Sequence, residues 1–180
     1  MIDLALGFIR ESLNHTLKQS LPGLKDPVLS GVAAPDGAIL HEIEDRIAIT
    51  LVNVQTVSAL ASGSRFSPGS GKSPGRLSPA LNLDLYLLVS AQFRDYPTSL
   101  KCLSVVLETI NNHPVHTRQS APELPPAVES LSLELMSLNL NELSSVWTTL
   151  GAKYRPSVIY KARLISNPEE GRRLPALSRG

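Results

Sequence analysis

The sequence predicts an α/β (α+β) fold: a single domain in which a mixed, largely antiparallel sheet packs with about three helices. Three segments have apolar residues every three or four positions, the period of a helix, while others alternate or run apolar like strands. Their order is helix, two or three strands, helix, strand, helix, strand, with no visible repeat. With 180 residues, 42% of them hydrophobic, the chain is long enough for one domain with a substantial core.

The first helix is predicted over residues 2–20, where charged and polar residues separate the apolar ones. Pro22 and Gly23 would end it. The expected buried face consists of Ile2, Ala5, Leu6, Ile9, Leu13 and Leu17.

Strands dominate the next part of the chain. A short β segment is expected over residues 28–32, and residues 46–54 are apolar on both faces, which predicts a central strand covered on both sides. Residues 81–93 alternate and form a second strand, while Gly, Ser and Pro dominate residues 58–80. The expectation is an extended hairpin whose two strands are joined by a flexible loop. In the strand at 46–54, one predicted face carries Ile47, Ile49 and Leu51, and the other carries Ala48, Thr50, Val52 and Val54.

A second helix is predicted to start at Asp95-Tyr96-Pro97, because proline is tolerated in a first helical turn. It should end at residues 111–114, and a polar, proline-rich connection follows to about residue 127. Its expected buried stripe consists of Leu100, Leu103, Val106, Leu107 and Ile110.

The last third alternates strand, helix and strand. A half-buried strand is expected around residues 129–138, with Leu131, Leu133 and Leu135 on one face. Asn139 to Glu142 resembles a capping box, which places a third helix at about 140–150, ended by Gly151. The final strand covers residues 157–165.

Charge and cysteine content exclude several classes of protein. The net charge is +1 and the pI about 7.9, too balanced for electrostatic binding of nucleic acid or of an anionic membrane. Cys102 is the single cysteine, so an internal disulfide is excluded, and its apolar surroundings predict a small buried side chain. The N-terminus lacks the basic region of a signal peptide, and no stretch reaches the roughly 18 apolar residues of a spanning helix. We expect a chain that is cytoplasmic when synthesised, without direct membrane insertion.

Gly71-Lys72-Ser73 matches the end of a phosphate-binding loop, but the rest of that motif is missing. The first glycine of the pattern would stand at position 66, which is Phe66. Pro74 and Gly75 follow at once, so no helix can present its N-terminal amides to a phosphate. A solvated loop without a nucleotide is expected.

No catalytic or metal-binding motif stands out elsewhere. His113 and His116 are close in sequence, but Pro114 breaks the helix that would align them, and no local ligand completes a site. The acidic residues at 42–45 fit a charged turn better than an acid–base pair. The sequence therefore predicts a non-enzymatic protein without cofactor or metal.

The best candidates for function are surface residues. Trp147, Tyr154, Arg155 and Tyr160 fall within fourteen residues, and these residue types often anchor protein interfaces. The alternative is that Trp147 and Tyr160 belong to the core and Arg155 is merely solvated; residue types alone leave both interpretations open.

The C-terminal block from Leu131 to Ile165 resembles a known family, and so do the opening residues "MIDLALGFIRESLN", the central "LNLDLYLLVSAQF" and "HPVHT". The pattern W-x-x-L-G-A-K-Y-x-P-S-V-x-Y-K, from Trp147 to Lys161, is the most specific part. These segments resemble the cap, or tail-terminator, proteins of phage-tail-like contractile injection systems, of the antifeeding-prophage and Photorhabdus virulence-cassette type.

The resemblance implies a tail-terminator-like cap domain over residues 1–165 and a C-terminal arm over residues 166–180. It implies a ring, expected to be a hexamer, that sits on the distal end of the inner tube and sheath, ends polymerisation and anchors the last sheath layer. The particle would be released or membrane-anchored. The resemblance supplies no catalytic residues, so the candidate contacts are inferred from this sequence: Trp147, Lys153, Tyr154, Arg155 and Tyr160 near the last strand, Lys72 and Arg76 in the loop, and Arg172 and Arg173 in the arm.

Two other hypotheses remain. One is a monomeric or dimeric adaptor that tethers a protein partner through the loop and the arm. The other is a small hydrolase, which would require a nucleophile–base pair within hydrogen-bond reach.

Overall fold

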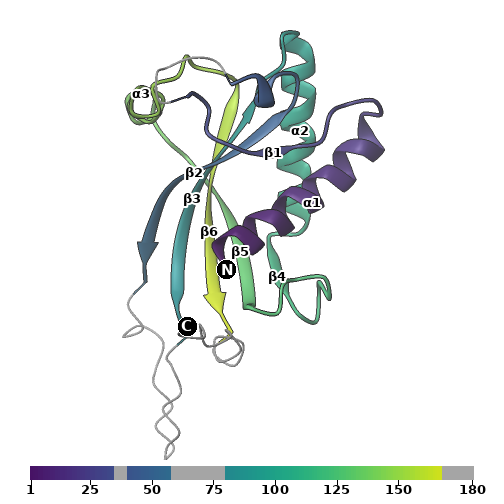
Figure 1. Ribbon diagram of the computed structural model, residues 1–180, viewed down its shortest axis with the longest axis vertical. Coiled ribbons are helices and arrows are strands. Elements are labelled where there is room, and N and C mark those ends of the chain that lie inside the picture. The colour runs from purple at the N-terminus through teal and green to yellow at the C-terminus, as the bar shows by residue number, and fades with distance from the viewer. Residues whose placement is uncertain (35–39, 58–79, 168–180) are drawn as a thin grey trace, which may run out of the picture.

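The structure is a computed structural model that describes residues 1–34, 40–57 and 80–167. A six-stranded sheet in the order β1-β2-β3-β6-β5-β4 has α1 and α2 on one face and α3 near one end of the other face (Figure 1). All pairs are antiparallel except β1 with β2. This confirms the predicted fold class.

The elements are α1 (Ile2–Ser20), β1 (Val28–Leu29), a 3-10 turn (His41–Ile43), β2 (Ile47–Thr56), β3 (Asn82–Ala91), α2 (Tyr96–Asn112), β4 (Val115–Thr117), β5 (Val128–Met136), α3 (Leu140–Thr149) and β6 (Ser157–Ser166).

The helix boundaries follow from local capping chemistry. Asp95 caps α2, because its carboxylate accepts a hydrogen bond from the Thr98 backbone N–H at 2.9 Å. In α3 the predicted capping box is present: Asn139 accepts from the Glu142 N–H, and the Glu142 side chain accepts from the Asn139 N–H. Gly151 follows α3 with a φ of +66°, a conformation that favours glycine.

The main core lies between the sheet and the helix pair α1–α2. The helix-facing side chains of β3 and β6 are almost fully buried there, including Leu85, Leu87 and Leu164. Cys102 is also buried in this core, as predicted, and burial raises the pKa of its thiol to about 11. The α1 face that the sequence predicted supplies Ala5, Leu6, Ile9, Leu13 and Leu17.

A smaller core lies on the opposite face of the sheet, under α3. Trp147 packs there against Leu88 of β3, Ile159 of β6 and Val32. Adjacent residues of β6 therefore serve two cores, because successive side chains of a strand point to opposite faces.

β2 corrects the prediction of a central strand covered on both sides. It lies next to the edge, where β1 pairs only with Ala48 and Ile49, and its burial falls from complete at Ile47 to exposed at Thr56. A β-bulge between Leu51 and Asn53 shifts the alternation by one residue. Val54 therefore faces the α1–α2 side opposite Leu85, and not the face that the sequence predicted.

Three smaller predictions also change. Leu100 is exposed and Leu107 only partly buried, because Ser99 and Cys102 take the buried positions of α2. Leu135 in β5 is exposed. The segment predicted as a plain connection contains β4, which pairs with Ser130–Ser132 of β5. The predicted loop at 58–80 lies outside the described residues apart from residue 80, and so does the arm beyond residue 167.

The part of the sheet that α3 leaves open carries a polar layer. Arg163 of β6 donates two hydrogen bonds to Asp84 of β3, at 2.8 and 3.0 Å, and Lys161 pairs with Glu134 of β5 at 2.6 Å. Opposite charges on directly paired residues stabilise neighbouring strands. This polar layer makes an antiparallel sheet compatible with an open face.

The central strand β3 gives a direct test of the packing. Leu85→Ala should lower the free energy of unfolding by about 2–5 kcal/mol, because Leu85 is completely buried and the substitution leaves a cavity. Leu81→Ala, at an exposed residue next to the same strand, should cost less than about 1 kcal/mol. Urea titrations followed by circular dichroism would measure both; equal losses would contradict the proposed core.

The Asp84–Arg163 pair predicts a dependence of stability on pH. Hydrogen bonds from Arg163 hold the pKa of Asp84 below its ordinary value of 3.8, so the ionised form stabilises the fold. That contribution is fully present above about pH 5 and is lost as the pH falls through the lowered pKa. Asp84→Asn should therefore cost about 1 kcal/mol at pH 7, since Arg163 is half exposed, and progressively less as the pH falls below 3.8. A pH-independent difference in unfolding free energy would refute this role.

Candidate functional site

The histidines and the cysteine do not assemble into a reactive centre in the described ranges. No group of three or more His, Cys, Asp or Glu residues there could hold a metal ion. His116 packs edge-on against the ring of Phe8, with 5.0 Å between centroids, and its burial, with the nearby His113, lowers its pKa. His116 thus contributes a packing contact between β4 and α1.

The strongest candidate is an apolar surface at α3, which we call the α3 surface. A hollow of about 550 Å³ is bordered by residues of α3 and of the turn that follows it. Leu140 at the start of α3 is 84% exposed and Tyr154 in the turn is 60% exposed, although both are large and mainly apolar. Exposed apolar groups gathered at one place are typical of a protein-binding surface. The lining consists of Leu140, Leu143, Ser144, Trp147, Thr148, Ala152 and Tyr154.

The sequence fixes the shape of this surface locally. The capping box starts α3 directly at Leu140, and Gly151 turns the chain back toward β6. Trp147 forms the buried floor at 3% exposure, and the ring of Tyr154 meets it edge-on with 5.7 Å between centroids. Edge-to-face contact is a favourable aromatic geometry. The Trp147 side chain thus holds Tyr154 in place at the rim.

The predicted interface residues separate into three groups. Tyr154 lies on the α3 surface, with Lys153 and Arg155 exposed beside it. Trp147 and Tyr160 are buried in different cores on opposite faces of the sheet. The other predicted contacts lie outside the described residues: Lys72, Arg76, Arg172 and Arg173. Their interface roles stay predictions.

Leu140 is the exposed large apolar member of the α3 surface that sequence reasoning missed. It precedes Leu143 and Trp147 by three and seven residues, so it continues their apolar stripe beyond the part that packs on the sheet. An apolar stripe that starts at the first residue of a capped helix is the signal that could have identified it.

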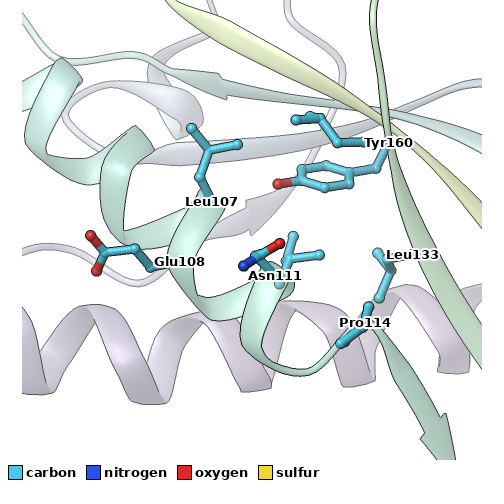
Figure 2. Close-up of a pocket in the computed structure, with 8 residues that line it drawn as sticks. Leu107, Glu108, Asn111, Pro114, Leu133 and Tyr160 are labelled. Atoms are coloured by element: carbon cyan, nitrogen blue, oxygen red, sulfur yellow. The ribbon is translucent and has the colours of Figure 1, made fainter.

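A second apolar cleft, of about 330 Å³, lies between α2 and strands β5 and β6. Figure 2 shows the Tyr160 ring extending from β6 toward α2, with Leu107, Leu133 and Pro114 around it. Burial raises the pKa of Tyr160 to about 12, so this phenol stays neutral at physiological pH.

In the described part of the chain, no helix is long and apolar enough to cross a bilayer.

The floor of the α3 surface can be tested through Trp147. Trp147→Ala should lower the free energy of unfolding by about 3–5 kcal/mol, because it removes the indole ring from the smaller core and leaves a cavity there. Trp147→Phe should cost much less, since the buried indole N–H has no hydrogen-bond partner among the described residues. Denaturation followed by circular dichroism would measure both. If Phe were as damaging as Ala, the indole N–H would have a partner.

Comparison with known proteins places this geometry in context. The chain aligns with one solved structure, described as the sheath/tube terminator of an extracellular contractile injection system (PVC) in the extended state, with a TM-score of 0.55 and 20% identity over 88% of this chain and 55% of that one. It also aligns with the tube-terminating cap of the anti-feeding prophage, with a TM-score of 0.53 and 22% identity over 96% of this chain and 59% of that one. The chain thus covers little more than half the length of either protein. A search of curated proteins found no match.

These alignments show a shared fold. The family model for the Pvc16 N-terminal domain matches residues 8–174, which includes all six strands, α2, α3 and about two thirds of α1. The chain therefore belongs to the Pvc16 N-terminal domain family, in agreement with the cap-protein resemblance of its sequence.

Proposed function

We propose that this chain is a structural terminator of a contractile injection particle. It forms a ring on the distal end of the inner tube and sheath, ends their polymerisation and anchors the last sheath layer. The observation that carries the proposal is the family match over residues 8–174, supported by the fold shared with two terminator structures. The protein acts by occupying a growing end, without catalysis.

The α3 surface supports a role in binding protein. A terminator must attach to the end of an existing assembly, and exposed apolar side chains around a hollow supply the desolvation that drives such contacts. Leu140 and Tyr154 are both exposed on one surface whose floor is formed by Trp147. We assign this surface to sheath or tube subunits of the particle.

A ring also needs two different complementary patches on each subunit, because contacts around a closed ring are heterologous. The ring can be tested directly. Electron microscopy and native mass spectrometry of the purified chain should reveal closed rings. Deletion of the gene should give particles of uncontrolled length or poor stability. A strictly monomeric protein at high concentration, together with normal particle lengths in the deletion strain, would overturn the proposal.

The α3 surface makes a more specific prediction. Tyr154→Ala and Leu140→Lys should each weaken binding to particles that lack the terminator about 30-fold or more, the loss typical of an interface hot spot. The unfolding free energy should change by no more than about 0.5 kcal/mol for Leu140→Lys, because that side chain is exposed, and by about 1 kcal/mol for Tyr154→Ala, because that variant also loses the edge-to-face contact with Trp147. Co-sedimentation with such particles measures the binding.

Tyr96→Ala is the matched control, since Tyr96 is 62% exposed and belongs to α2, away from the α3 surface. It should leave binding unchanged. Equal loss of binding for the Tyr96 and Tyr154 variants would show that exposed tyrosines matter in general and that the α3 surface is not the site.

A further inference from the structure

The lysines and arginines of the described ranges differ in whether they have a partner. Some pair with a carboxylate, as Lys18 does with Asp26 at 2.8 Å, and others donate to a backbone carbonyl, as Lys25 does to Glu44 at 3.1 Å. In the same ranges, four basic side chains have neither an ion pair nor a hydrogen bond: Arg46, Lys101, Lys153 and Arg155. Lys101 belongs to α2, whereas the other three lie at the end of the sheet where β2 and β6 begin (Figure 1).

Arg46 and Arg155 occupy positions on either side of Gln92. Arg46 directly precedes β2, and its carbonyl oxygen accepts a hydrogen bond from the Gln92 N–H at 2.9 Å. Across β3, the Ala91 N–H donates to the Pro156 carbonyl at 2.9 Å, so the register of β3 with β6 places Arg155 opposite Gln92. Neighbouring strands are about 4.8 Å apart, which puts the Cα atoms of the two arginines roughly 10 Å apart.

These positions adjoin the α3 surface. Gln92 lies four residues after Leu88 of β3, and alternation puts Gln92 and its neighbour Arg46 on the same face as Leu88, which packs under α3. Tyr154, which lines the hollow, stands between two exposed basic residues of the turn. We call the three unpaired cations at this place the basic rim: Arg46, Lys153 and Arg155.

Arg46 carries a charge that the folded subunit leaves unbalanced. Its Nε is buried and has no hydrogen-bond partner among the described residues. The acidic residues just before it bond to other groups, since Glu42, Glu44 and Asp45 all have partners different from Arg46. A partly buried guanidinium without a counter-ion has lost part of its hydration without compensation. A carboxylate supplied from outside would provide that compensation through charge-assisted hydrogen bonds.

We propose that the α3 surface and the basic rim together bind an acidic segment of a sheath or tube subunit. An apolar side chain of that segment fills the hollow, and a carboxylate lies between Arg46 and Arg155. This inference rests on the proposed function and names the chemistry of the partner that the terminator binds. Complementary charges beside an apolar contact steer the partner toward the surface and fix its orientation there.

The apolar hollow indicates a protein segment as the anionic partner. Nucleic acid is bound through many phosphate contacts along a basic surface, whereas the net charge of this chain is only +1. A peptide can combine an apolar side chain with a carboxylate a few residues away, and that combination matches a hollow beside a small group of cations.

Reversal of charge at the two exposed positions tests the basic rim. The Lys153→Glu, Arg155→Glu double variant should bind particles that lack the terminator at least about 10-fold more weakly than the wild type, whereas Arg155→Lys, which keeps the charge, should stay within about threefold. Lys101→Glu is the matched control, because Lys101 is also exposed and without an ion pair in the described ranges but lies on α2. It should bind like the wild type. Co-sedimentation measures the binding, and circular dichroism would verify that each variant is folded.

Salt gives a second readout that a loss of packing would not change. Exposed charges are screened as the ionic strength rises, so wild-type binding should weaken about tenfold between roughly 0.05 M and 0.5 M NaCl. The double variant should be much less sensitive to salt. Tyr154→Ala removes an apolar contact and no charge, so it should keep the salt dependence of the wild type.

Arg46 requires a variant that separates binding from folding. Arg46→Met keeps an unbranched apolar stem and removes a partly buried charge that has no partner among the described residues, so thermal unfolding should occur at or above the wild-type temperature. Binding to the particles should fall about tenfold. Unchanged binding would remove Arg46 from the site, and a lower unfolding temperature would show that Arg46 has a structural role instead.

The outcomes separate this inference from the proposed function. If the wild-type chain does not bind particles that lack the terminator, both fail. If it binds without salt dependence and the double variant binds equally well, the terminator stands and the acidic partner is overturned. Weak, salt-insensitive binding by the double variant, together with normal binding by Lys101→Glu, supports the acidic partner.

Two further outcomes would assign the basic rim to another occupant and overturn the inference. A double variant that binds the particles normally but no longer forms rings would show that the acidic partner is a second copy of this chain. Binding of duplex DNA at about 0.15 M NaCl that the double variant loses would assign the basic rim to nucleic acid.

Discussion

The structure depends on an unequal covering of one sheet. Two long helices bury one face of β3 and β6 almost completely, whereas the short α3 covers only one end of the other face. A sheet can leave a face open only where its side chains are polar, and the cross-strand pairs Asp84–Arg163 and Glu134–Lys161 occupy that open part. The positions of the α3 surface and of the charged layer both follow from this asymmetry.

The positions of the helices and strands along the chain could be predicted well from the sequence, but their order in the sheet could be predicted less well. The helices were predictable because period and caps are local: Asn139 and Glu142 mark the start of α3 without tertiary information. β2 was misassigned as central because an apolar run looks the same at the centre and near an edge. β4 was missed because three residues after Pro114 are too few for an alternation to be recognised.

The candidate site was predictable in composition but not in geometry. Trp147, Tyr154 and Tyr160 attracted attention because of their residue types, and the structure separates them: Tyr154 is at a rim, Trp147 beneath it, and Tyr160 on the opposite face. Which face a strand residue takes depends on the partner strands, and sequence spacing does not contain that information. Leu140 was missed because an apolar residue in a helix is expected to be buried.

The β-bulge in β2 has a consequence for how this strand tolerates change in length. Before the bulge, the odd-numbered residues of β2 face the α1–α2 core, and after it the even-numbered residues do. Leu51 and Val54 therefore share one face although they are three residues apart. Loss of one residue at the bulge would leave Leu51 and Val54 two residues apart, which is the spacing at which a regular strand places side chains on one face, so the ladder with β3 would become regular and neither half would turn over. The segment between Ile49 and Val54 is therefore a place where relatives should tolerate the loss of one residue, since such a strand would lose the bulge and keep the same side chains toward α1 and α2.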